Sequence, residues 1–358
     1  MLKKLREQRH ILLRVKVSVD EIIQQVQKIR SNYSVLAICP DVTGNNYQGV
    51  KSATLGLFPM NTLVLPQYFS KSVYSVAELK KIAQAIAGLK FETIVFSGMP
   101  RYCETLIHTL KSHKNLSAKI LFIYHGSLSS NTEYGLDASD YLDWLLEITS
   151  SKQITKLAFV KKGMAELFYS LQKLNTHHLL LKTPELKPAK INFEKDELHI
   201  GVLGSGHYRK NFHNQVAAAL LFSEAKVHVK KTDELNYLKS NSRIVQHKYF
   251  ENHSEFLNLV GSMSLNFYVT FSECWGQLVT ESLMMGVPCL AAYNSGILDF
   301  DIDLKEALVV EDFDNAVAIY NQALQVLENR KEISEKGIIY VKELNKIADD
   351  RLIQFLKA

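Results

Sequence analysis

Residues 271–292, FSECWGQLVTESLMMGVPCLAA, contain the pattern from which the architecture of the chain follows. The apolar run that leads into them, LNFYVTF at 265–271, predicts a buried strand, and residues 289–292 predict another. Between the two strands lie a loop with Glu273 and a helical run with Glu281. A strand, a helix and a second strand in this order predict neighbouring strands of a parallel sheet. Ligands bind outside the carboxyl ends of such strands, so we expect Glu273 to lie at the mouth of a site.

The same alternation runs through most of the chain. Further apolar runs predict strands at 34–39, 63–65, 93–96, 119–124, 154–160, 198–203, 226–229 and 243–246. Helical patterns are found at 74–88, 101–113, 313–328 and 332–356. Strands that alternate with helices predict an α/β fold with parallel sheets covered on both faces.

The length of 358 residues favours two domains, at roughly 150 residues per domain. The polar stretch TPELKP at 183–188 has the composition of a linker. We therefore predict four parts, with the main boundary at 190. They are a basic amphipathic N-terminal segment (1–31), two α/β domains (32–190 and 191–330) and a C-terminal helix (331–358).

The N-terminal segment holds eight Lys or Arg and three Asp or Glu, interleaved with apolar residues. Two interpretations stay open. Residues 1–17 could lie on an anionic membrane surface, or the segment could be a solvated helix that packs on the first domain.

Composition narrows the class of protein. A hydrophobic content of 47% and a charged content of 22% are typical of a soluble globular protein. The net charge of +5 favours anionic ligands, and we expect no nucleic-acid partner. The four cysteines lack metal-ligand spacing and indicate reduced thiols. With no apolar secretory segment and no apolar run of about 18 residues, we expect a cytoplasmic protein. Under the membrane interpretation of residues 1–17, it would be peripheral on the inner membrane face.

The stretch GVLGSG at 201–206 is close to a dinucleotide-binding fingerprint but fails two tests. The third glycine would fall at position 209, which is Arg, and the next strand ends in Lys230 and Lys231 where the ribose-binding acid belongs. A nicotinamide-dependent enzyme is therefore disfavoured. A glycine turn at Gly204 and Ser205, followed by Arg209 and Lys210 at an expected helix start, suits a diphosphate.

A longer pattern resembles a known family. Ser272-Glu273-x-x-Gly276 is followed by Glu281, eight positions after the first glutamate, and by Gly286-Val287-Pro288. This arrangement resembles the signature of the retaining GT-B glycosyltransferases of family 4 (group 1). The resemblance implies two Rossmann-like domains that face a central cleft, with a C-terminal helix that crosses back to the first domain. It also implies a nucleotide-diphosphate sugar as donor, with no cofactor and no metal.

The resemblance further implies roles for residues of the second domain. Glu273 would bind the donor sugar and Glu281 the ribose, and Lys210 and the helix start would bind the diphosphate. That helix start comprises Gly276, Gln277 and Leu278. Ser205 stands where the family has an arginine, so Arg209 is the alternative source of that charge.

Three loops of the first domain follow predicted strands. The resemblance implies that His125, which follows the strand 119–124, touches the donor sugar and forms the catalytic set with Glu273 and Lys210. The alternative is a loop histidine that bonds to the backbone. Gly44, Asn45 and Arg101 are the acceptor-side candidates, although Arg101 also suits an ordinary surface position.

The alternating acids Asp299, Asp301 and Asp303 would suit a divalent cation. Because the resemblance implies catalysis without a metal, we expect a solvated loop or strand face there instead.

The sequence thus predicts a hexosyltransferase-like enzyme that moves a sugar from a nucleotide-diphosphate sugar to a glycan, glycolipid or protein acceptor with retention of anomeric configuration. Two alternatives stay open: a nucleotide-sugar epimerase or hydrolase of the same fold, and a non-catalytic GT-B-like protein that binds nucleotide sugars.

Overall fold

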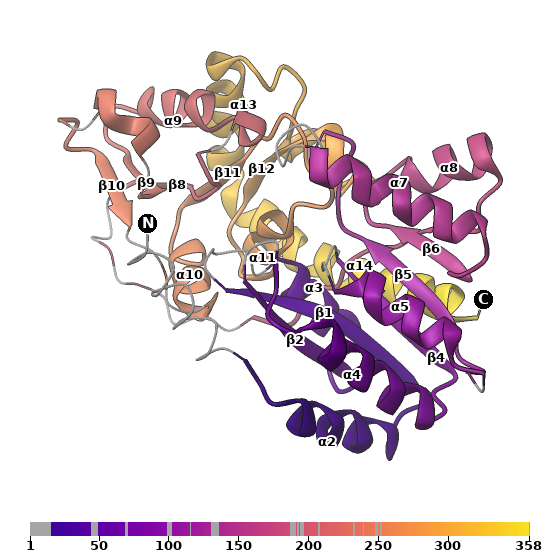
Figure 1. The fold of residues 1–358 in the computed structure, drawn as a ribbon. Coiled ribbons are helices and arrows are strands. Elements are labelled where there is room, and N and C mark those ends of the chain that lie inside the picture. Colours follow the sequence, from indigo (N-terminus) through magenta and orange to yellow (C-terminus); the bar gives the residue numbers. More distant parts are fainter. Residues whose placement is uncertain are drawn as a thin grey trace. The chain divides into compact units, whose positions relative to one another are not determined.

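The chain forms two compact units, unit 1 (Met1–Lys182 with Ala348–Ala358) and unit 2 (Thr183–Ile347). Each is built on its own sheet and is described by itself (Figure 1). The structure is a computed structural model that describes residues 16–43, 49–68, 71–98, 102–114, 116–129, 136–186, 191, 193, 197–206, 208–231, 233–238, 240–247, 250 and 253–357. The acceptor-side candidates Gly44, Asn45 and Arg101 lie outside these residues, as do residues 1–15 of the basic segment.

Unit 1 contains a sheet of seven strands in the order β3-β2-β1-β4-β5-β6-β7. All neighbours pair in parallel except β3, which is antiparallel to β2. The strands are β1 (Val35–Thr43), β2 (Thr62–Tyr68), β3 (Lys71–Ser72), β4 (Thr93–Ser97), β5 (Lys119–Tyr124), β6 (Lys156–Phe159) and β7 (Thr176–His178). The helices are α2 (Val19–Arg30), α3 (Gly49–Leu57), α4 (Val76–Gly88), α5 (Cys103–Ser112), α7 (Leu136–Ser150) and α8 (Met164–Gln172).

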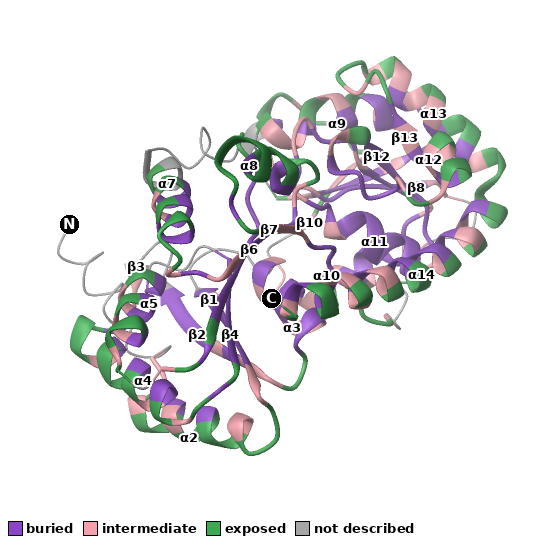
Figure 2. Cartoon of the chain, turned by 90° about the vertical axis from the view of Figure 1, so that its right-hand side faces the viewer, coloured by how far each residue is buried: buried purple, intermediate pink, exposed green. Residues whose placement is uncertain are grey.

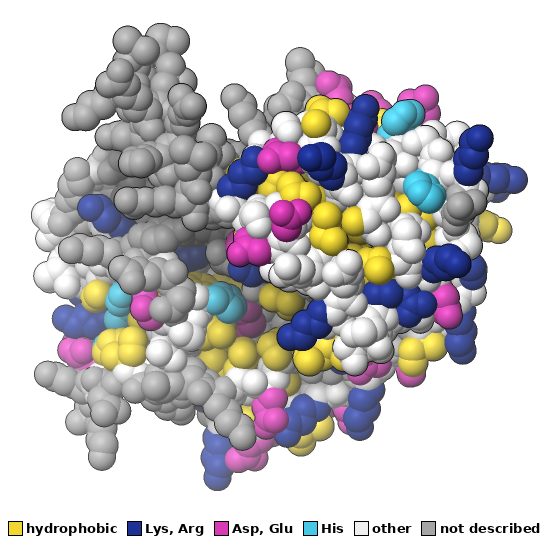
Figure 3. Space-filling view, turned by 60° about the horizontal axis from the view of Figure 1, so that its bottom comes forward, with side chains coloured by type: hydrophobic (Ala, Val, Ile, Leu, Met, Phe, Trp, Pro, Cys, Tyr) yellow, Lys and Arg dark blue, Asp and Glu magenta, His cyan; other side chains and the backbone are white. Residues whose placement is uncertain are grey.

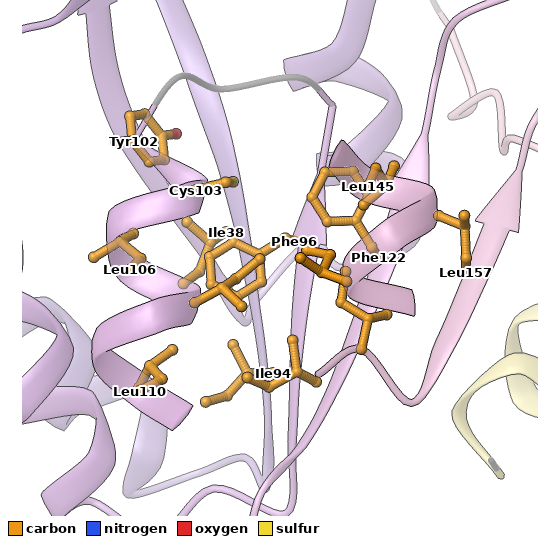
Figure 4. Packing of buried hydrophobic residues seen from close by; sticks show 14 of the residues in the cluster. Ile38, Ile94, Phe96, Tyr102, Cys103, Leu106, Leu110, Phe122, Leu145 and Leu157 are labelled. Atoms are coloured by element: carbon orange, nitrogen blue, oxygen red, sulfur yellow. The ribbon is translucent and has the colours of Figure 1, made fainter. Parts of the chain in front are cut away.

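The core of unit 1 lies between this sheet and its helices. Every residue of β4 is buried, as expected for a parallel strand that is covered on both faces. The rings of Phe96 and Phe122 lie 6.4 Å apart, and Figure 4 shows Leu106 and Leu110 of α5 on the same side of the strands. Figure 2 shows β4 as buried, whereas helices such as α2 and α4 expose one side.

Helix α2 accounts for the described part of the basic segment. Ser18 and Glu21 form a capping box, with Glu21 N–H donating to Ser18 Oγ at 3.2 Å. Ile22 and Val26 are buried in the core of unit 1. Residues 19–30 therefore form a helix that packs on the first domain, which was one of the two interpretations of this segment.

Unit 2 contains six parallel strands in the order β10-β9-β8-β11-β12-β13. They are β8 (His199–Val202), β9 (Lys226–Lys230), β10 (Ile244–His247), β11 (Leu265–Tyr268), β12 (Cys289–Ala292) and β13 (Val309–Val310). The α-helices are α9 (Phe212–Leu220), α10 (His253–Val260), α11 (Gln277–Met284), α12 (Ile302–Leu308), α13 (Ala316–Glu328) and α14 (Arg330–Leu356). Three 3-10 turns complete the unit: η1 (Tyr208–Lys210), η2 (Asp233–Leu238) and η3 (Tyr293–Ser295).

Helix α14 begins in unit 2 and ends in unit 1, which contains its residues from Ala348 onward. There Arg351 Nη1 contacts His178 Nδ1 at 2.9 Å, and the ring of Phe355 stacks on His177 at 5.8 Å. The predicted crossing of the C-terminal helix to the first domain is confirmed.

The expected loop is found at Asp299 and Asp301, which precede α12, whereas Asp303 lies in the helix itself. Asp301 is the N-cap of α12 and accepts a hydrogen bond from Leu304 N–H at 2.9 Å. Asp299 pairs with Lys305 at 2.7 Å, and Asp303 pairs with Lys336. Within the described ranges, no cluster of three His, Cys, Asp or Glu residues could hold a metal ion.

The described helices and the surface in Figure 3 bear on contact with membranes and with anionic partners. None of these helices combines the length and the apolar character needed to cross a membrane. On the face in Figure 3, the Lys and Arg side chains lie among Asp and Glu side chains and do not gather into one basic surface.

Candidate functional site

The candidate site lies at the carboxyl ends of the strands of unit 2. Strands β8, β9 and β11 are neighbours in the sheet, and the segments that follow them carry most of the predicted residues. Lys210 ends the 3-10 turn after β8, and Glu273 lies in the loop after β11. The parallel topology therefore brings together residues that are 63 positions apart in the sequence.

Glu273 is the centre of the site. Its Oε2 accepts hydrogen bonds from Lys210 Nζ and, at 2.7 Å, from the hydroxyl of Tyr268. Arg209 Nη1 lies 3.7 Å from the same oxygen. Its other oxygen, Oε1, accepts a 3.0 Å hydrogen bond from Cys274 N–H. Two cations and a phenol thus surround a buried carboxylate.

These neighbours determine the charge of Glu273. Burial alone would raise the pKa of this carboxyl group, but Lys210, Arg209 and the hydrogen bond from Tyr268 outweigh burial and lower the pKa to about 2. Glu273 is therefore ionised at neutral pH and holds no proton to donate. A general acid needs a raised pKa, and the lowered pKa of Glu273 does not suit that role.

The thiol of Cys274 is no nucleophile candidate. Burial, and then the charge of Glu273, raise the pKa of Cys274 to about 12. The thiolate is the reactive form, and it is absent at neutral pH.

Two amide side chains fix the loop that carries Glu273. Asn294 Oδ1 accepts from Glu273 N–H at 3.0 Å, while its Nδ2 donates to the carbonyl of Thr270. Gln215 Nε2 donates to the carbonyl of Lys210 at 2.6 Å, and its Oε1 accepts from Val269 N–H at 2.9 Å. These contacts hold the chain on both sides of the Lys210–Glu273 pair in place.

Helix α11 follows this loop as predicted. Gly276 is its N-cap with a φ of 90°, a conformation that strongly favours glycine, and Gln277 begins the helix. The first N–H groups of a helix have no partner inside it and can bind an anion. Leu278 is buried in an apolar cluster with Leu203 and Val287, so it can contribute its backbone rather than its side chain.

Glu281 lies in the second turn of α11 and is buried. Its Oε1 lies 3.0 Å from Nε2 of His253, the first residue of α10. His253 was not predicted from the sequence, because nothing in the local pattern shows that α10 begins opposite α11.

The turn after β8 differs from the prediction in one respect. Arg209 and Lys210 do not begin the helix. They lie in η1, ahead of α9. Asn211, which connects η1 to α9, is in the left-handed conformation with a φ of 52°. Arg209 Nη1 donates to the carbonyl of Ser272 at 3.0 Å, which directs this side chain toward the Glu273 loop. Gly204 and Ser205 lie in the turn itself.

A further cation, Lys230, was treated in the sequence only as a failed dinucleotide test. It is the last residue of β9, and its ammonium group lies 4.4 Å from the centre of the Phe256 ring. The signal that could have identified it is its position, because it ends a parallel strand next to β8.

His125 belongs to unit 1 and follows β5. Its Nε2 lies 2.9 Å from Ser97 Oγ, which in turn lies 2.6 Å from Thr54 Oγ1. Thr54 donates its proton to the carbonyl of Val50, so Ser97 donates to Thr54 and His125 Nε2–H donates to Ser97. Burial lowers the pKa of His125 to about 4, so the ring is neutral at pH 7 and its Nδ1 is an acceptor. Among the described residues, the hydrogen bond of His125 is to the side chain of Ser97.

Comparison with known proteins identifies structures with a similar fold, although the sequence itself has no match. No family model matches the sequence, and no curated protein matches it either. Among solved structures, sucrose-phosphate synthase from Thermosynechococcus elongatus has a TM-score of 0.67 at 13% identity, covering 90% of this chain and 98% of that one. Trehalose-6-phosphate synthase OtsA has a TM-score of 0.65 at 9% identity, covering 90% and 98%. A TarM mutant of S. aureus, solved with fondaparinux, alpha-GlcNAc-glycerol and UDP, has a TM-score of 0.59 at 10% identity, covering 78% and 59%.

The chain therefore has the GT-B fold. Its two parallel sheets with surrounding helices match those of the sucrose-phosphate and trehalose-6-phosphate synthases over almost their full length. The fold class that the sequence predicted is confirmed.

Proposed function

We propose that this protein is a glycosyltransferase that moves a sugar from a nucleotide-diphosphate sugar to an acceptor. The observation that carries the proposal is the position of Glu273, Lys210 and Arg209 at the carboxyl edge of the unit 2 sheet, with the N-terminus of α11 three residues after Glu273. Cations and free N–H groups stabilise a diphosphate as negative charge develops on it, and such electrostatic stabilisation is commonly the largest part of catalysis. The GT-B fold supports the proposed activity only by analogy with other proteins of this fold.

In this proposal, different residues bind different parts of the donor. Lys210, Arg209 and the backbone of Gln277 and Leu278 bind the diphosphate, and Gly204 and Ser205 allow its close approach. Glu273, ionised and fixed by Asn294, accepts hydrogen bonds from hydroxyl groups of the sugar. Glu281 accepts the ribose hydroxyls, and His253 holds its carboxylate in place.

The finer assignments are part of the same proposal. We propose retention of anomeric configuration, a hexose as the transferred sugar and catalysis without a metal ion or cofactor, with cations of the chain acting on the leaving group. His125 is assigned to the donor sugar, where its Nδ1 would accept a hydrogen bond from a hydroxyl group. The acceptor would be a glycan, glycolipid or protein, and residues 1–17 are the segment to test for contact with an anionic membrane surface in the cytoplasm.

The first experiment is a screen of nucleoside diphosphates, including UDP, by thermal shift, followed by a transfer assay with the nucleotide sugars of the best base. Stabilisation together with release of the diphosphate from the sugar is the expected result. Nucleotide binding without turnover of any donor would support the non-catalytic alternative. A product that keeps both nucleotide and sugar would support an epimerase.

Glu281→Ala tests the ribose assignment. Because the buried carboxylate would lose two hydrogen bonds to the ribose, we expect nucleoside diphosphate affinity to fall by about tenfold or more, measured by titration calorimetry. Glu328→Ala, an exposed glutamate of α13, is the control and leaves affinity unchanged. An unchanged dissociation constant in the Glu281 variant would refute this role.

A further inference from the structure

The side chain of Lys230 has an unusual environment. Side chains alternate along a strand, so Lys230 and His228 of β9 lie on the same face of the unit 2 sheet. His228 is fixed there by a 2.9 Å contact with His199 on β8 and a 2.8 Å contact with His247 on β10. Lys230 ends the strand beyond this histidine row, at the edge where the segments with Lys210 and Glu273 begin.

The ammonium group of Lys230 has a described aromatic neighbour. It lies over the ring of Phe256, and among the described residues none forms a hydrogen bond or an ion pair with it. A surface lysine extends its charged end into water, whereas this one directs it onto a ring at a partly buried site. A partly buried cation in that position is available to an anionic ligand.

Two residues of the proposed donor site lie within electrostatic reach of Lys230. Burial lowers its pKa first, the charge of Lys210 lowers it further, and the charge of Glu281 raises it. Glu281 already contacts His253, so neutralising that carboxylate does not require Lys230.

We propose that Lys230 binds the phosphate group of the donor that is attached to the ribose. The inference rests on the proposed function, in which Glu281 holds the ribose and Lys210 acts on the diphosphate. Lys230 ends the strand next to β8 and lies over Phe256 of α10, the helix whose first residue, His253, contacts Glu281. These contacts direct Lys230 toward the nucleoside side of the diphosphate, where the proximal phosphate belongs. Lys230 then gives the site a third cation and makes the nucleotide part of the donor, in addition to the leaving phosphate, a determinant of binding.

The test compares Lys230→Met with Lys231→Met. Methionine keeps the apolar stem over Phe256 and removes the charge, and Lys231 is the exposed neighbour, which serves as the matched control. Affinities for uridine, UMP and UDP are measured by calorimetry on the full-length protein. If another base gives the larger thermal shift, its nucleoside, monophosphate and diphosphate replace the uridine series.

For Lys230→Met we expect the monophosphate and the diphosphate to bind about tenfold more weakly or worse, with nucleoside affinity unchanged and Lys231→Met equal to wild type. Equal losses for all three ligands would show that Lys230 acts through Glu281 and the ribose, and would overturn the proposal. A loss confined to the diphosphate would move the contact to the distal phosphate and overturn it as well. Lys230→Arg is the second variant, and recovery of monophosphate binding in it shows that charge, not folding, explains the loss.

Failure of the proposed function has a different signature. Wild-type protein would then bind no nucleotide of any base. If wild type binds the diphosphate and both lysine variants match it, the role of Lys230 is rejected, whereas the proposed function is decided separately by the transfer assay.

Discussion

At the scale of single residues, Glu273 combines two properties that usually exclude each other. It is buried, which disfavours a charge, yet Lys210 and Arg209 keep it charged. Breaking one side of a buried ion pair leaves an uncompensated charge, which is strongly destabilising. An arriving diphosphate would compensate the cations, and a sugar hydroxyl would compensate the carboxylate.

Glu273→Gln separates these two roles. The amide keeps the shape of the side chain but removes the negative charge that opposes Lys210 and Arg209. We expect nucleoside diphosphate affinity to stay equal or increase, because both cations become available to the ligand. Transfer should fall by about 100-fold, because the sugar loses the group that positions it. Calorimetry gives the first quantity and the transfer assay the second.

Glu224→Gln, at an exposed position beyond α9, is the matched control and should change neither quantity. A loss of diphosphate affinity greater than threefold in Glu273→Gln would contradict the assignment of Glu273 to the sugar.

The sequence pointed to residues of the candidate site in two ways and missed others for one reason. The rule that ligands bind outside the carboxyl ends of parallel strands placed Glu273 at the mouth of a site, and the family resemblance assigned Lys210 to the same site. Tyr268 and Asn294 are absent from that prediction, because their roles depend on side-chain direction and on which loops meet. His253 depends on the packing of α10 against α11, which no local pattern encodes.

At the scale of elements, strands β8, β9 and β10 share a row of three histidines. His199, His228 and His247 are linked ring to ring, and the carboxylate of Glu197 lies 3.6 Å from His199 Nε2. A negative charge at that end favours a proton on His199 Nε2, so His199 Nδ1 accepts from His228 and His228 Nδ1 accepts from His247. Protonating His199 Nδ1 or His228 Nδ1 would therefore remove an acceptor and break one of the two ring contacts.

This row predicts how stability depends on pH. Burial, and then His247 and His199, lower the pKa of His228 to about 3, and burial also lowers the pKa of the other two rings. Below the ordinary histidine pKa of about 6.5, the unfolded chain binds protons that the folded row refuses. Stability is therefore complete above about pH 6.5 and falls as pH decreases. His228 alone should cost about 1.4 kcal/mol in the free energy of unfolding between pH 7.5 and 5.5.

Urea unfolding at the two pH values measures this difference, with Trp275 fluorescence as the reporter for unit 2. The window lies above the range in which Glu273 gains its proton, so that carboxylate does not contribute. In His228→Gln the difference should shrink by about 1 kcal/mol. An undiminished pH dependence in this variant would show that the row does not resist protonation.

Elements with a strong apolar pattern were predictable, and short ones were not. β5 and β12 have the predicted bounds, whereas β7 and β13 have two or three residues and no pattern of their own. β7 exists because β6 pairs with it on one side while α14 supplies Arg351 and Phe355 to its histidines. β1 continues through Pro40 to Thr43, past its predicted end, because β2 pairs with it along that whole length.

At the scale of the whole molecule, α14 is one continuous helix of 27 residues that contributes to both cores. In unit 2, Tyr340 is buried and donates to the carbonyl of Ile297. In unit 1, Phe355 is fully buried at the other end. The chain has two tryptophans, Trp144 in α7 of unit 1 and Trp275 in unit 2, so each unit has its own fluorescent reporter.

Phe355→Ala tests whether the crossing helix stabilises unit 1. Removing a buried phenylalanine costs about 3–5 kcal/mol, and here the stacking on His177 is also lost. In a Trp275→Phe background, we expect the urea midpoint reported by Trp144 to fall markedly. In a Trp144→Phe background, the midpoint reported by Trp275 should change much less. Ile353→Ala, exposed on the same helix, is the control, with an expected cost below about 1 kcal/mol. Equal shifts at both tryptophans would show that α14 makes the two units unfold as one, and no shift at Trp144 would show that unit 1 is stable without the end of the helix.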